Sequence, residues 1–181
     1  VRTTLVRANG EMCVAGATTT PAGTPYVATW TGTQWTLLGT GLAFRATHLI
    51  ESQGGALWAC GDAQSYYFDG GVAELVGSQW TTRGTTGGVA TALDRMPDGD
   101  IIVGGGFQTI GGVAAARIAR WDRDTNTWHA LGTGLNGDAT AVLAMPNGDV
   151  IAAGLFSEAG GQQAFRVARW NGTSWSPLGV G

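Results

Sequence analysis

The sequence is poor in charged residues, and the few that it has do not form a basic stripe. Asp, Glu, Lys and Arg make up 13% of the 181 residues, and the formal net charge at pH 7 is -3. Proteins that bind nucleic acid usually concentrate positive charge on one face or along one segment. The composition therefore argues against a nucleic-acid partner.

Long hydrophobic runs are also missing. A membrane-spanning helix needs about 20 consecutive apolar residues, and no run in this sequence approaches that length. We therefore expect no membrane insertion. The chain starts with Val1, and its first residues already have the pattern of a strand. It is expected to be a processed protein or an excised segment, in which a targeting signal would not be visible.

Histidine and cysteine are scarce, which limits catalytic and metal chemistry. The chain has two histidines, His48 and His129, and two cysteines, Cys13 and Cys60. A zinc cluster needs more soft ligands than these, and a hydrolytic triad needs a histidine beside a nucleophile and an acid. We predict no catalytic residue, no metal site and no cofactor. The cysteines are interpreted as small buried hydrophobic residues, with a disulfide as the alternative.

Glycine and tryptophan, by contrast, are abundant. The chain has 31 glycines and 8 tryptophans, and 44% of its residues are hydrophobic. Disordered chains combine high charge with few aromatic residues, so this composition predicts a folded protein. Scattered glycines are typical of many tight turns between short strands. An all-β fold is therefore favoured.

Four copies of one unit fill the chain. The segments NGEMCVAG, GGALWACG, DGDIIVGG and NGDVIAAG each hold two glycines six residues apart, and the first glycines are separated by 45, 44 and 49 residues. Two aromatic or apolar anchors and a glycine follow in each unit. They are Trp30, Leu75, Trp121 and Trp170, then Trp35, Trp80, Trp128 and Trp175, then Gly39, Gly84, Gly132 and Gly179. Such a period indicates a repeat architecture, with units at about 1–44, 45–89, 90–138 and 139–181.

Each unit has the pattern of a four-stranded antiparallel meander. In the third unit we expect strands at 91–96, 101–105, 117–122 and 127–132, with a long loop at 106–115. The alternation has a period of two, and Asn-Gly or Asp-Gly pairs supply tight turns. One such sheet cannot bury both of its faces alone. The sequence therefore predicts a β-propeller with four blades in this chain, as one domain or part of one.

The paired tryptophans are predicted to pack between neighbouring blades, because they recur at the same positions on the third and fourth strands. The first strand of each unit would line the axis of the propeller, where small residues fit. The predicted packing residues are Trp30, Trp35, Trp80, Trp121, Trp128, Trp170 and Trp175.

These motifs resemble a known repeat. Gly104 and Gly105 close a strand, and Trp121 and Trp128 follow, which resembles the kelch repeat. The segment GGGFQTIGGVAAARIARWDRDTNTWHALGTGLNGD is similar to kelch-like repeats of fungal cortical polarity-marker proteins and of bacterial and phage surface proteins. Copies one and two match less well, and copy two has Leu75 and Arg83 where others have tryptophan and leucine. The resemblance implies a propeller scaffold for binding, with an extracellular, cell-surface or virion-surface location.

Four copies leave three arrangements open, because kelch propellers usually have six or seven blades. The chain could form a closed four-bladed ring, a half-ring that pairs with a second chain, or a segment of a longer propeller. An open array would leave tryptophan-rich faces uncovered at both ends. This favours self-association or further sequence over the closed four-bladed ring.

One cluster departs from the repeat and is the candidate ligand site. Copy two has DAQSYYFDGG where copies three and four share a GxFxxxGG pattern. Aromatic rings beside carboxylates suit stacking on sugars or anchoring of a protein partner. The candidate residues are Tyr66, Tyr67, Phe68, Asp62 and Asp69.

The remaining motifs are interpreted as structural. Phe107 and Phe156 are predicted to fix the loops that carry them, and the segment DRDTNT at 122–127 is a lengthened hairpin turn rather than a calcium loop. Arginines repeat in ARIARW and FRVARW, which indicates stacking on tryptophan or bridging between blades.

The function expected from the sequence is that of a non-enzymatic binding and assembly module. Its partner would be another protein or a second copy of the chain. A lectin-like carbohydrate binder is the first alternative. An enzyme on a propeller scaffold is the second, and the scarcity of histidine makes it the weaker one.

Overall fold

The computed structural model describes residues 1–19, 25–62 and 70–179, and this part of the chain consists of strands and turns without helix. The prediction of an all-β fold is confirmed. The strands are β1 (Thr3–Val6), β2 (Met12–Thr19), β3 (Pro25–Trp30), β4 (Trp35–Leu37), β5 (Arg45–Glu51), β6 (Leu57–Asp62), β7 (Gly70–Val76), β8 (Gln79–Thr86), β9 (Ala90–Arg95), β10 (Ile101–Gly105), β11 (Thr109–Ile110), β12 (Val113–Ala114), β13 (Ile118–Asp122), β14 (Thr127–Ala130), β15 (Ala139–Ala144), β16 (Val150–Gly154), β17 (Glu158–Ala159), β18 (Gln162–Gln163), β19 (Val167–Trp170) and β20 (Trp175–Pro177).

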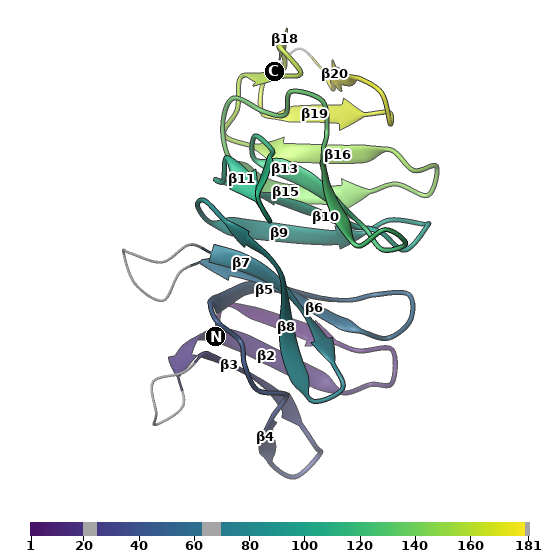
Figure 1. Ribbon diagram of the computed structural model, residues 1–181. Helices are drawn as coiled ribbons and strands as arrows, with labels where there is room; N and C mark the ends of the chain where they lie inside the picture. The colour runs from purple at the N-terminus through teal and green to yellow at the C-terminus, as the bar shows by residue number, and fades with distance from the viewer. Residues whose placement is uncertain (20–24, 63–69, 180–181) are drawn as a thin grey trace.

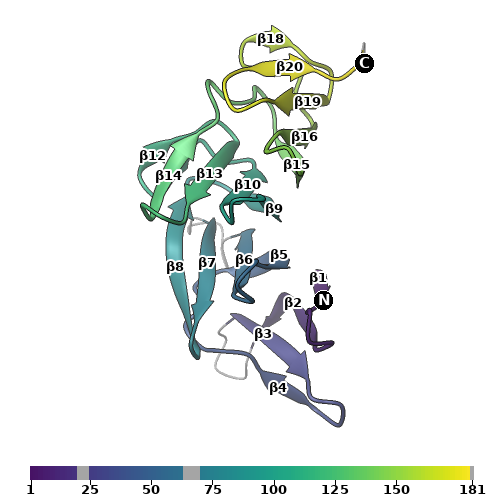
Figure 2. The same ribbon diagram turned by 90° about the vertical axis from the view of Figure 1, so that its right-hand side faces the viewer.

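Four antiparallel meanders form four blades. Their strand orders are β1-β2-β3-β4, β5-β6-β7-β8, β9-β10-β13-β14 and β15-β16-β19-β20, and the sheet of the second blade continues from β8 into β11 and β12. The blades are stacked one after another along the chain (Figure 1). In the turned view they follow an arc, with the first strands β1, β5, β9 and β15 on its inner side (Figure 2). This is the arrangement of propeller blades around an axis.

The glycine that ends each second strand is required by its close approach to the first strand. In the second, third and fourth blades the register between these two strands shifts near this point. A Cβ at Gly61, Gly105 or Gly154 would overlap a backbone carbonyl oxygen of the first strand or of the residue before it. Only glycine lets the two backbones approach so closely, which explains why the second glycine of each motif recurs.

The segment at 106–115 is a hairpin rather than the expected loop, and the equivalent segment at 155–165 is also a hairpin. In the third blade β11 and β12 pair with each other, and Ile110 of β11 pairs with Thr86 of the preceding blade. In the fourth blade β17 and β18 pair, and Ala159 forms a bridge with Leu135. The hairpins therefore tie the third and fourth blades to the blade before each of them. The alternation of apolar and polar residues within one unit does not predict these pairings, because the partner residues belong to another unit.

Two phenylalanines anchor these hairpins. Phe107 and Phe156 are 0% and 2% exposed and belong to the cores beneath the hairpins. Their backbone carbonyl oxygens accept hydrogen bonds from Arg117 N and Arg166 N, at 2.9 and 3.0 Å. The prediction that both phenylalanines fix their segments is confirmed.

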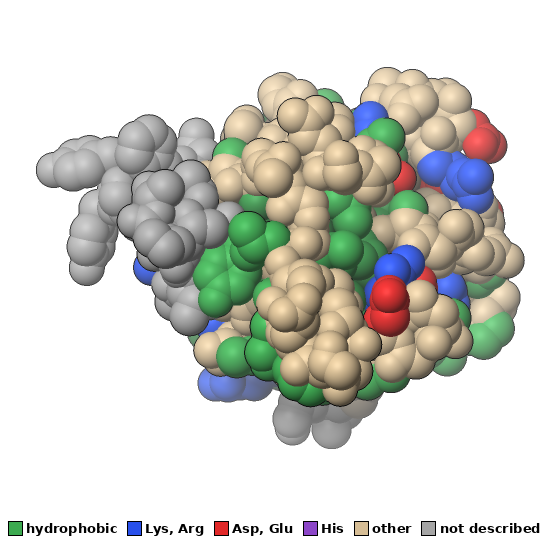
Figure 3. Space-filling view, turned by 90° about the horizontal axis from the view of Figure 1, so that it is seen from below, with side chains coloured by type: hydrophobic (Ala, Val, Ile, Leu, Met, Phe, Trp, Pro, Cys, Tyr) green, Lys and Arg blue, Asp and Glu red, His purple; other side chains and the backbone are tan. Residues whose placement is uncertain are grey.

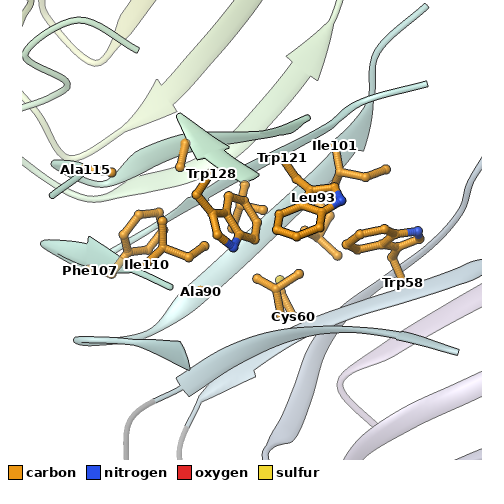
Figure 4. Packing of buried hydrophobic residues seen from close by; sticks show 13 residues of the cluster. Trp58, Cys60, Ala90, Leu93, Ile101, Phe107, Ile110, Ala115, Trp121 and Trp128 are labelled. Carbon is orange, nitrogen blue, oxygen red and sulfur yellow. The ribbon is translucent and has the colours of Figure 1, made fainter. Parts of the chain in front are cut away.

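Each hydrophobic core lies between two blades. One cluster joins the first and second blades, one joins the second and third, and one joins the third and fourth. Figure 4 shows the middle cluster, in which Trp58 and Cys60 of the second blade face Trp121 and Trp128 of the third. Burial of apolar surface is the main favourable term in folding, so each blade depends on its neighbours for stability.

A tryptophan hydrogen bond recurs at every junction. The indole Nε1 of Trp80 donates to Leu38 O at 2.8 Å, that of Trp128 donates to Arg83 O at 2.9 Å, and that of Trp175 donates to Leu131 O at 2.7 Å. In each pair the tryptophan lies at or next to the first residue of the fourth strand of one blade. The carbonyl belongs to a residue near the end of the fourth strand of the preceding blade. We call this the tryptophan junction bond.

The glycine next to each acceptor carbonyl makes room for the tryptophan. A Cβ at Gly84 would lie 2.6 Å from Trp128 Nε1, and a Cβ at Gly39 would lie 3.0 Å from Trp80 Nε1. The repeated tryptophan and glycine, four residues apart in each unit, therefore serve two different junctions.

We predict that Gly84→Ala lowers the free energy of unfolding by about 1–3 kcal/mol, because the added methyl group overpacks the junction against Trp128. Gly54→Ala is the control, since a Cβ there meets nothing within 4 Å; it should change stability by less than about 0.5 kcal/mol. Urea denaturation followed by tryptophan fluorescence measures both. Equal stability of the two variants would contradict this account of the junction.

Candidate functional site at the two ends of the array

The first blade carries the junction tryptophan, and within residues 1–19, 25–62 and 70–179 no blade packs against that side of it. Trp35 is 47% exposed, whereas Trp80, Trp128 and Trp175 are 4%, 6% and 6% exposed. Among the described residues, none accepts a hydrogen bond from the Trp35 indole. Its ring instead pairs with that of Trp30 in its own blade, with ring centroids 5.3 Å apart. The donor of a tryptophan junction bond is therefore accessible at this end.

The rest of this face is also apolar. Val6, Met12 and Leu37 are 68%, 37% and 57% exposed. Figure 3 views the molecule from this end and shows hydrophobic side chains as a patch in the middle of the face. We call this surface, made of Val6, Met12, Trp30, Trp35 and Leu37, the front face. Contiguous apolar patches of this kind mark interaction sites in soluble proteins.

The last blade presents the opposite half of a junction. Leu178 aligns with Leu131, the residue whose carbonyl accepts the bond from Trp175, but Leu178 is 43% exposed while Leu131 is 3% exposed. A Cβ at Gly179 would meet nothing within 4 Å, because no tryptophan lies against it. We call this surface, made of Leu143, Ile151, Val167, Leu178 and Gly179, the back face.

A threonine hydroxyl on the first strand also forms a hydrogen bond to the next blade at the inner junctions, and lacks that partner on the back face. Thr47 Oγ1 donates to Ala90 O of the next blade, and Thr91 Oγ1 donates to Ala139 O, both at 2.8 Å. The equivalent Thr140 Oγ1 reaches only Ala153 O of its own blade, at 3.4 Å. The back face therefore offers a carbonyl acceptor and a hydroxyl donor in the positions where the inner junctions use them.

The predicted copy-two cluster is described only in part. Tyr66, Tyr67, Phe68 and Asp69 lie outside the described residues, so this site stays a prediction. Asp62 is described, and its carboxylate forms ion pairs with Arg2 Nη1 at 2.6 Å and Arg45 Nε at 3.1 Å. Asp62 thus joins the first and second blades.

The predicted packing tryptophans occupy different environments. Trp80, Trp121, Trp128 and Trp175 are buried, Trp30 and Trp170 are half-buried, and Trp35 is exposed. Within blades the rings pair at tilted angles, Trp121 with Trp128 at 5.2 Å and Trp170 with Trp175 at 5.5 Å between centroids.

Sequence reasoning missed Trp58. This residue is 4% exposed, and its ring lies 6.3 Å from that of Trp121 in the next blade. The signal was present, because the other three copies have Cys13, Ile102 and Ile151 at this position.

Two of the repeated arginines act within a blade rather than between blades. Arg120 forms ion pairs with Asp100 and, at 3.0 Å, with Asp98, while Arg169 Nη2 lies 2.6 Å from Asp149 Oδ2. These aspartates follow the turn between the first and second strands of the same sheet. The expectation of blade bridging is therefore wrong for this pair, because a carboxylate on the adjacent strand is nearer than the next blade.

Arg117 reaches the segment that connects the third blade to the fourth. Its Nη1 donates to Leu135 O at 2.8 Å, and its backbone has a φ of 68°. Arg166, at the same position in the fourth blade, has the same φ of 68°. Among the described residues its side chain has no hydrogen-bond partner, because the surface that it would reach lies beyond the back face.

Both cysteines are buried free thiols. Burial raises the pKa of Cys60 to about 12 and also raises that of Cys13. Thiolates are the reactive form of cysteine, so these residues act as small apolar side chains of the inter-blade cores.

The histidines differ in environment. His129 is exposed, with Nε2 3.0 Å from Thr127 Oγ1. His48 lies at the interface of the second and third blades, where its Nδ1 accepts a hydrogen bond from Leu93 N at 3.2 Å. Desolvation lowers the pKa of His48, and the nearby Asp94 carboxylate opposes this shift.

Four meander blades with shared cores define the molecule as a β-propeller protein, a class of binding and scaffold modules. The chain belongs to the family described as the Rax2 C-terminal beta propeller domain, whose profile matches residues 73–179, more than half of the sequence. The predicted propeller is thus confirmed, while the narrower kelch affiliation stays a prediction. No curated protein matches the chain.

Two solved propellers have a similar fold. The WD40 beta propeller domain of Doa1 matches with a TM-score of 0.53 and 16% identity, over 82% of this chain and 45% of that chain. A polysaccharide lyase, the PL25 ulvan lyase, matches with a TM-score of 0.51 and 13% identity, over 96% of this chain and 56% of that chain. The chain thus spans about half the length of each, and at these identities the likeness shows the fold alone.

Membrane insertion has no helical candidate in the described ranges, since none of the segments there forms a helix of the length and apolar character that crossing a bilayer requires.

We predict that the free energy of unfolding falls as the pH is lowered through about 6.5, the pKa of a histidine in an unfolded chain. Because the pKa of His48 is lower in the folded state, the unfolded state takes up the proton first. The stabilisation is complete above the unfolded pKa and is lost below it. Urea denaturation between about pH 5.5 and 7.5 measures the effect. In His48→Gln, which does not titrate, the pH dependence should be smaller; an unchanged dependence would contradict the assignment.

Proposed function

We propose that this chain is a non-enzymatic β-propeller module for binding and assembly, whose front face joins the back face of a second copy. One observation carries the proposal. The front face offers the indole N–H of Trp35, and the back face offers the carbonyl of Leu178. Pairing them would repeat between two chains the bond that occurs at all three junctions within the chain.

The arc of blades supports a closed assembly. Contacts between unlike faces generate either a ring or an open filament, depending on the rotation between units. The four blades curve in one direction with their first strands inside (Figure 2). Two such arcs joined at both ends would form a ring of eight blades. The second contact then forms within one complex, which greatly raises its effective concentration.

The exposed side chains are sufficient in size to drive this association. Each large apolar side chain that becomes fully buried contributes about 1.5–3 kcal/mol. Trp35, Leu37 and Val6 on one face and Leu143 and Leu178 on the other are all more than 40% exposed. The loss of free motion on association costs roughly 4–15 kcal/mol, which the combined burial at two junctions can offset.

The family supports binding rather than catalysis as the role of this module, and we propose a protein partner in addition to the second copy. A location at the surface of a cell or virion remains our proposal from the repeat resemblance. A lectin-like role is the second candidate, and the cavity described below favours it.

We predict a mass near twice 18.6 kDa when the protein is measured by light scattering coupled to size exclusion. Trp35→Ala removes the donor and one large apolar side chain of the front face, and Leu178→Asp places a charge in the back face. Each should shift the protein to monomer. Val76→Asp is the matched control, because Val76 is 49% exposed but lies on the second blade, away from both ends.

A wild-type protein that stays monomeric at all concentrations tested would contradict this proposal. It would indicate instead that the end faces are covered by other blades or by a different protein. Loss of the dimer in Val76→Asp alone would place the interface elsewhere.

A further inference from the structure

A polar cavity of about 260 Å³ lies between the second and third blades. Trp58, Glu74 and Arg83 line it from the second blade, and Trp121, Arg123 and Asn126 line it from the third. It opens where the turn at 52–56 lies, at the end of the second blade opposite Asp62. It is therefore distinct from the predicted copy-two cluster and from both end faces. We call it the junction cleft.

Three of the residues by which copy two departs from the repeat line this cleft. Trp58, Glu74 and Arg83 each occupy a position where the other three copies have different side chains, and all three line the cavity. The residues at the equivalent positions are Cys13, Ile102 and Ile151, then Thr29, Arg120 and Arg169, then Leu38, Leu131 and Leu178.

The third copy contributes a departure to the same cleft. Its turn at 122–127 is two residues longer than in the other copies and supplies Arg123 and Asn126. Asn126 adopts a φ of 55°, and the Asp122 carboxylate accepts hydrogen bonds from Asp124 N and Thr125 N at 2.9 Å, which fixes the turn. Unique features of two neighbouring copies thus build one cavity.

The charged pair in the cleft keeps free hydrogen-bonding capacity. Arg83 Nε and Nη2 both donate to Glu74 Oε2, at 2.9 and 2.6 Å. Among the described residues, Glu74 Oε1 and Arg83 Nη1 have no hydrogen-bond partner. The side chains are 20% and 26% exposed. An acceptor and a donor held side by side match two adjacent hydroxyl groups of a sugar, one donating to the carboxylate and one accepting from the guanidinium.

The floor of the cleft is aromatic. Trp58 and Trp121 lie with ring centroids 6.3 Å apart, and the Arg83 guanidinium carbon lies 5.9 Å from the Trp121 centroid. Both rings are largely buried (Figure 4), so they offer their rims to the cavity. Such rims suit the C–H groups of a sugar ring, with the polar groups of the cleft bonding its hydroxyls.

A cation stands at the opening. Arg123 is 55% exposed, and its only ion pair among the described residues is with Asp124, at 3.9 Å, whose side chain is 93% exposed. An exposed pair at this distance contributes little. Since Glu74 is paired with Arg83, Arg123 gives the cleft a net positive charge. A ligand with an anionic group would be attracted here.

We infer that the junction cleft binds one sugar unit of an oligosaccharide that carries an anionic group, a carboxylate or a sulfate. The adjacent hydroxyls bond Glu74 and Arg83, the ring contacts the rims of Trp58 and Trp121, and the anionic group pairs with Arg123. This site is independent of the proposed self-association, so either can fail without the other.

Isothermal titration of the whole chain with three tetrasaccharides tests the inference. The probes are a galacturonic acid tetramer, a sulfated galactan tetramer and neutral cellotetraose. We expect saturable binding of at least one anionic probe, and binding of cellotetraose at least about tenfold weaker. The difference between the first two probes identifies the anionic group. Absence of binding to all three would overturn the inference.

The double variant Glu74→Thr with Arg83→Leu assigns the binding to the cleft. Copy one has Thr29 and Leu38 at these positions, so both residues are compatible with a blade. The variant should weaken binding by about tenfold or more, and Arg123→Gln should remove the preference for anionic probes. Arg166→Gln, which removes an exposed charge on the fourth blade that has no ion pair among the described residues, is the matched control. Equal effects of this control and the double variant would overturn the assignment.

Two further measurements keep the test decisive. If the double variant does not fold, the indole N–H resonances of the wild-type protein give the answer, because the anionic probe should shift those of Trp58 and Trp121 and leave that of Trp35 unchanged. Tyr66→Ala with Tyr67→Ala distinguishes the two candidate sites. Binding lost in this variant and retained in the cleft variant would place the ligand at the copy-two cluster and overturn the inference.

Discussion

The hydrogen bond from a tryptophan indole to a carbonyl of the preceding blade is the interaction on which the rest of the structure depends. Each blade is a small sheet with two faces to cover, and the junction covers one face of each of two blades at once. A net hydrogen bond contributes about 0.5–1.5 kcal/mol, and burial of an aromatic side chain contributes more. The bond fixes the position of the ring, and the ring supplies the burial. Geometry and stability are thus set by the same residue.

This constraint explains which positions repeat and which are free to change. The tryptophan, the glycine beneath it and the glycine that ends the second strand all serve close approaches between backbones or rings. The turns are held by local charge pairs such as Arg169 with Asp149. The chain contains no lysine, so arginine, whose planar fork suits fixed carboxylate geometry, makes all the cationic side-chain contacts. Positions outside these contacts, such as Trp58, can vary between copies.

Much of the fold could be predicted from the sequence, because the evidence for it is local and repeated four times. Alternating patterns and Asn-Gly or Asp-Gly turns locate the strands, and the recurring tryptophans indicate packing between units. The hairpins around Ile110 and Ala159 could not be predicted in this way, since their pairing partners belong to another unit. The same limit applies to the site. Comparison of copies identifies Trp58 and Glu74 as unusual, but their shared cavity depends on how the third blade packs against the second.

The placement of every core between blades, rather than within one, has a consequence for cooperativity. The described part of the chain has three cores for its four blades, so in an isolated arc of four blades the outermost ones are each held on one side and fray first. When the front face of one chain packs against the back face of another, a further core forms between them without any added residue. In a closed ring every blade is then held on both sides. No blade can open without breaking two junctions. A ring of this kind would unfold as a single unit, whereas the open arc would lose its blades one by one from the ends.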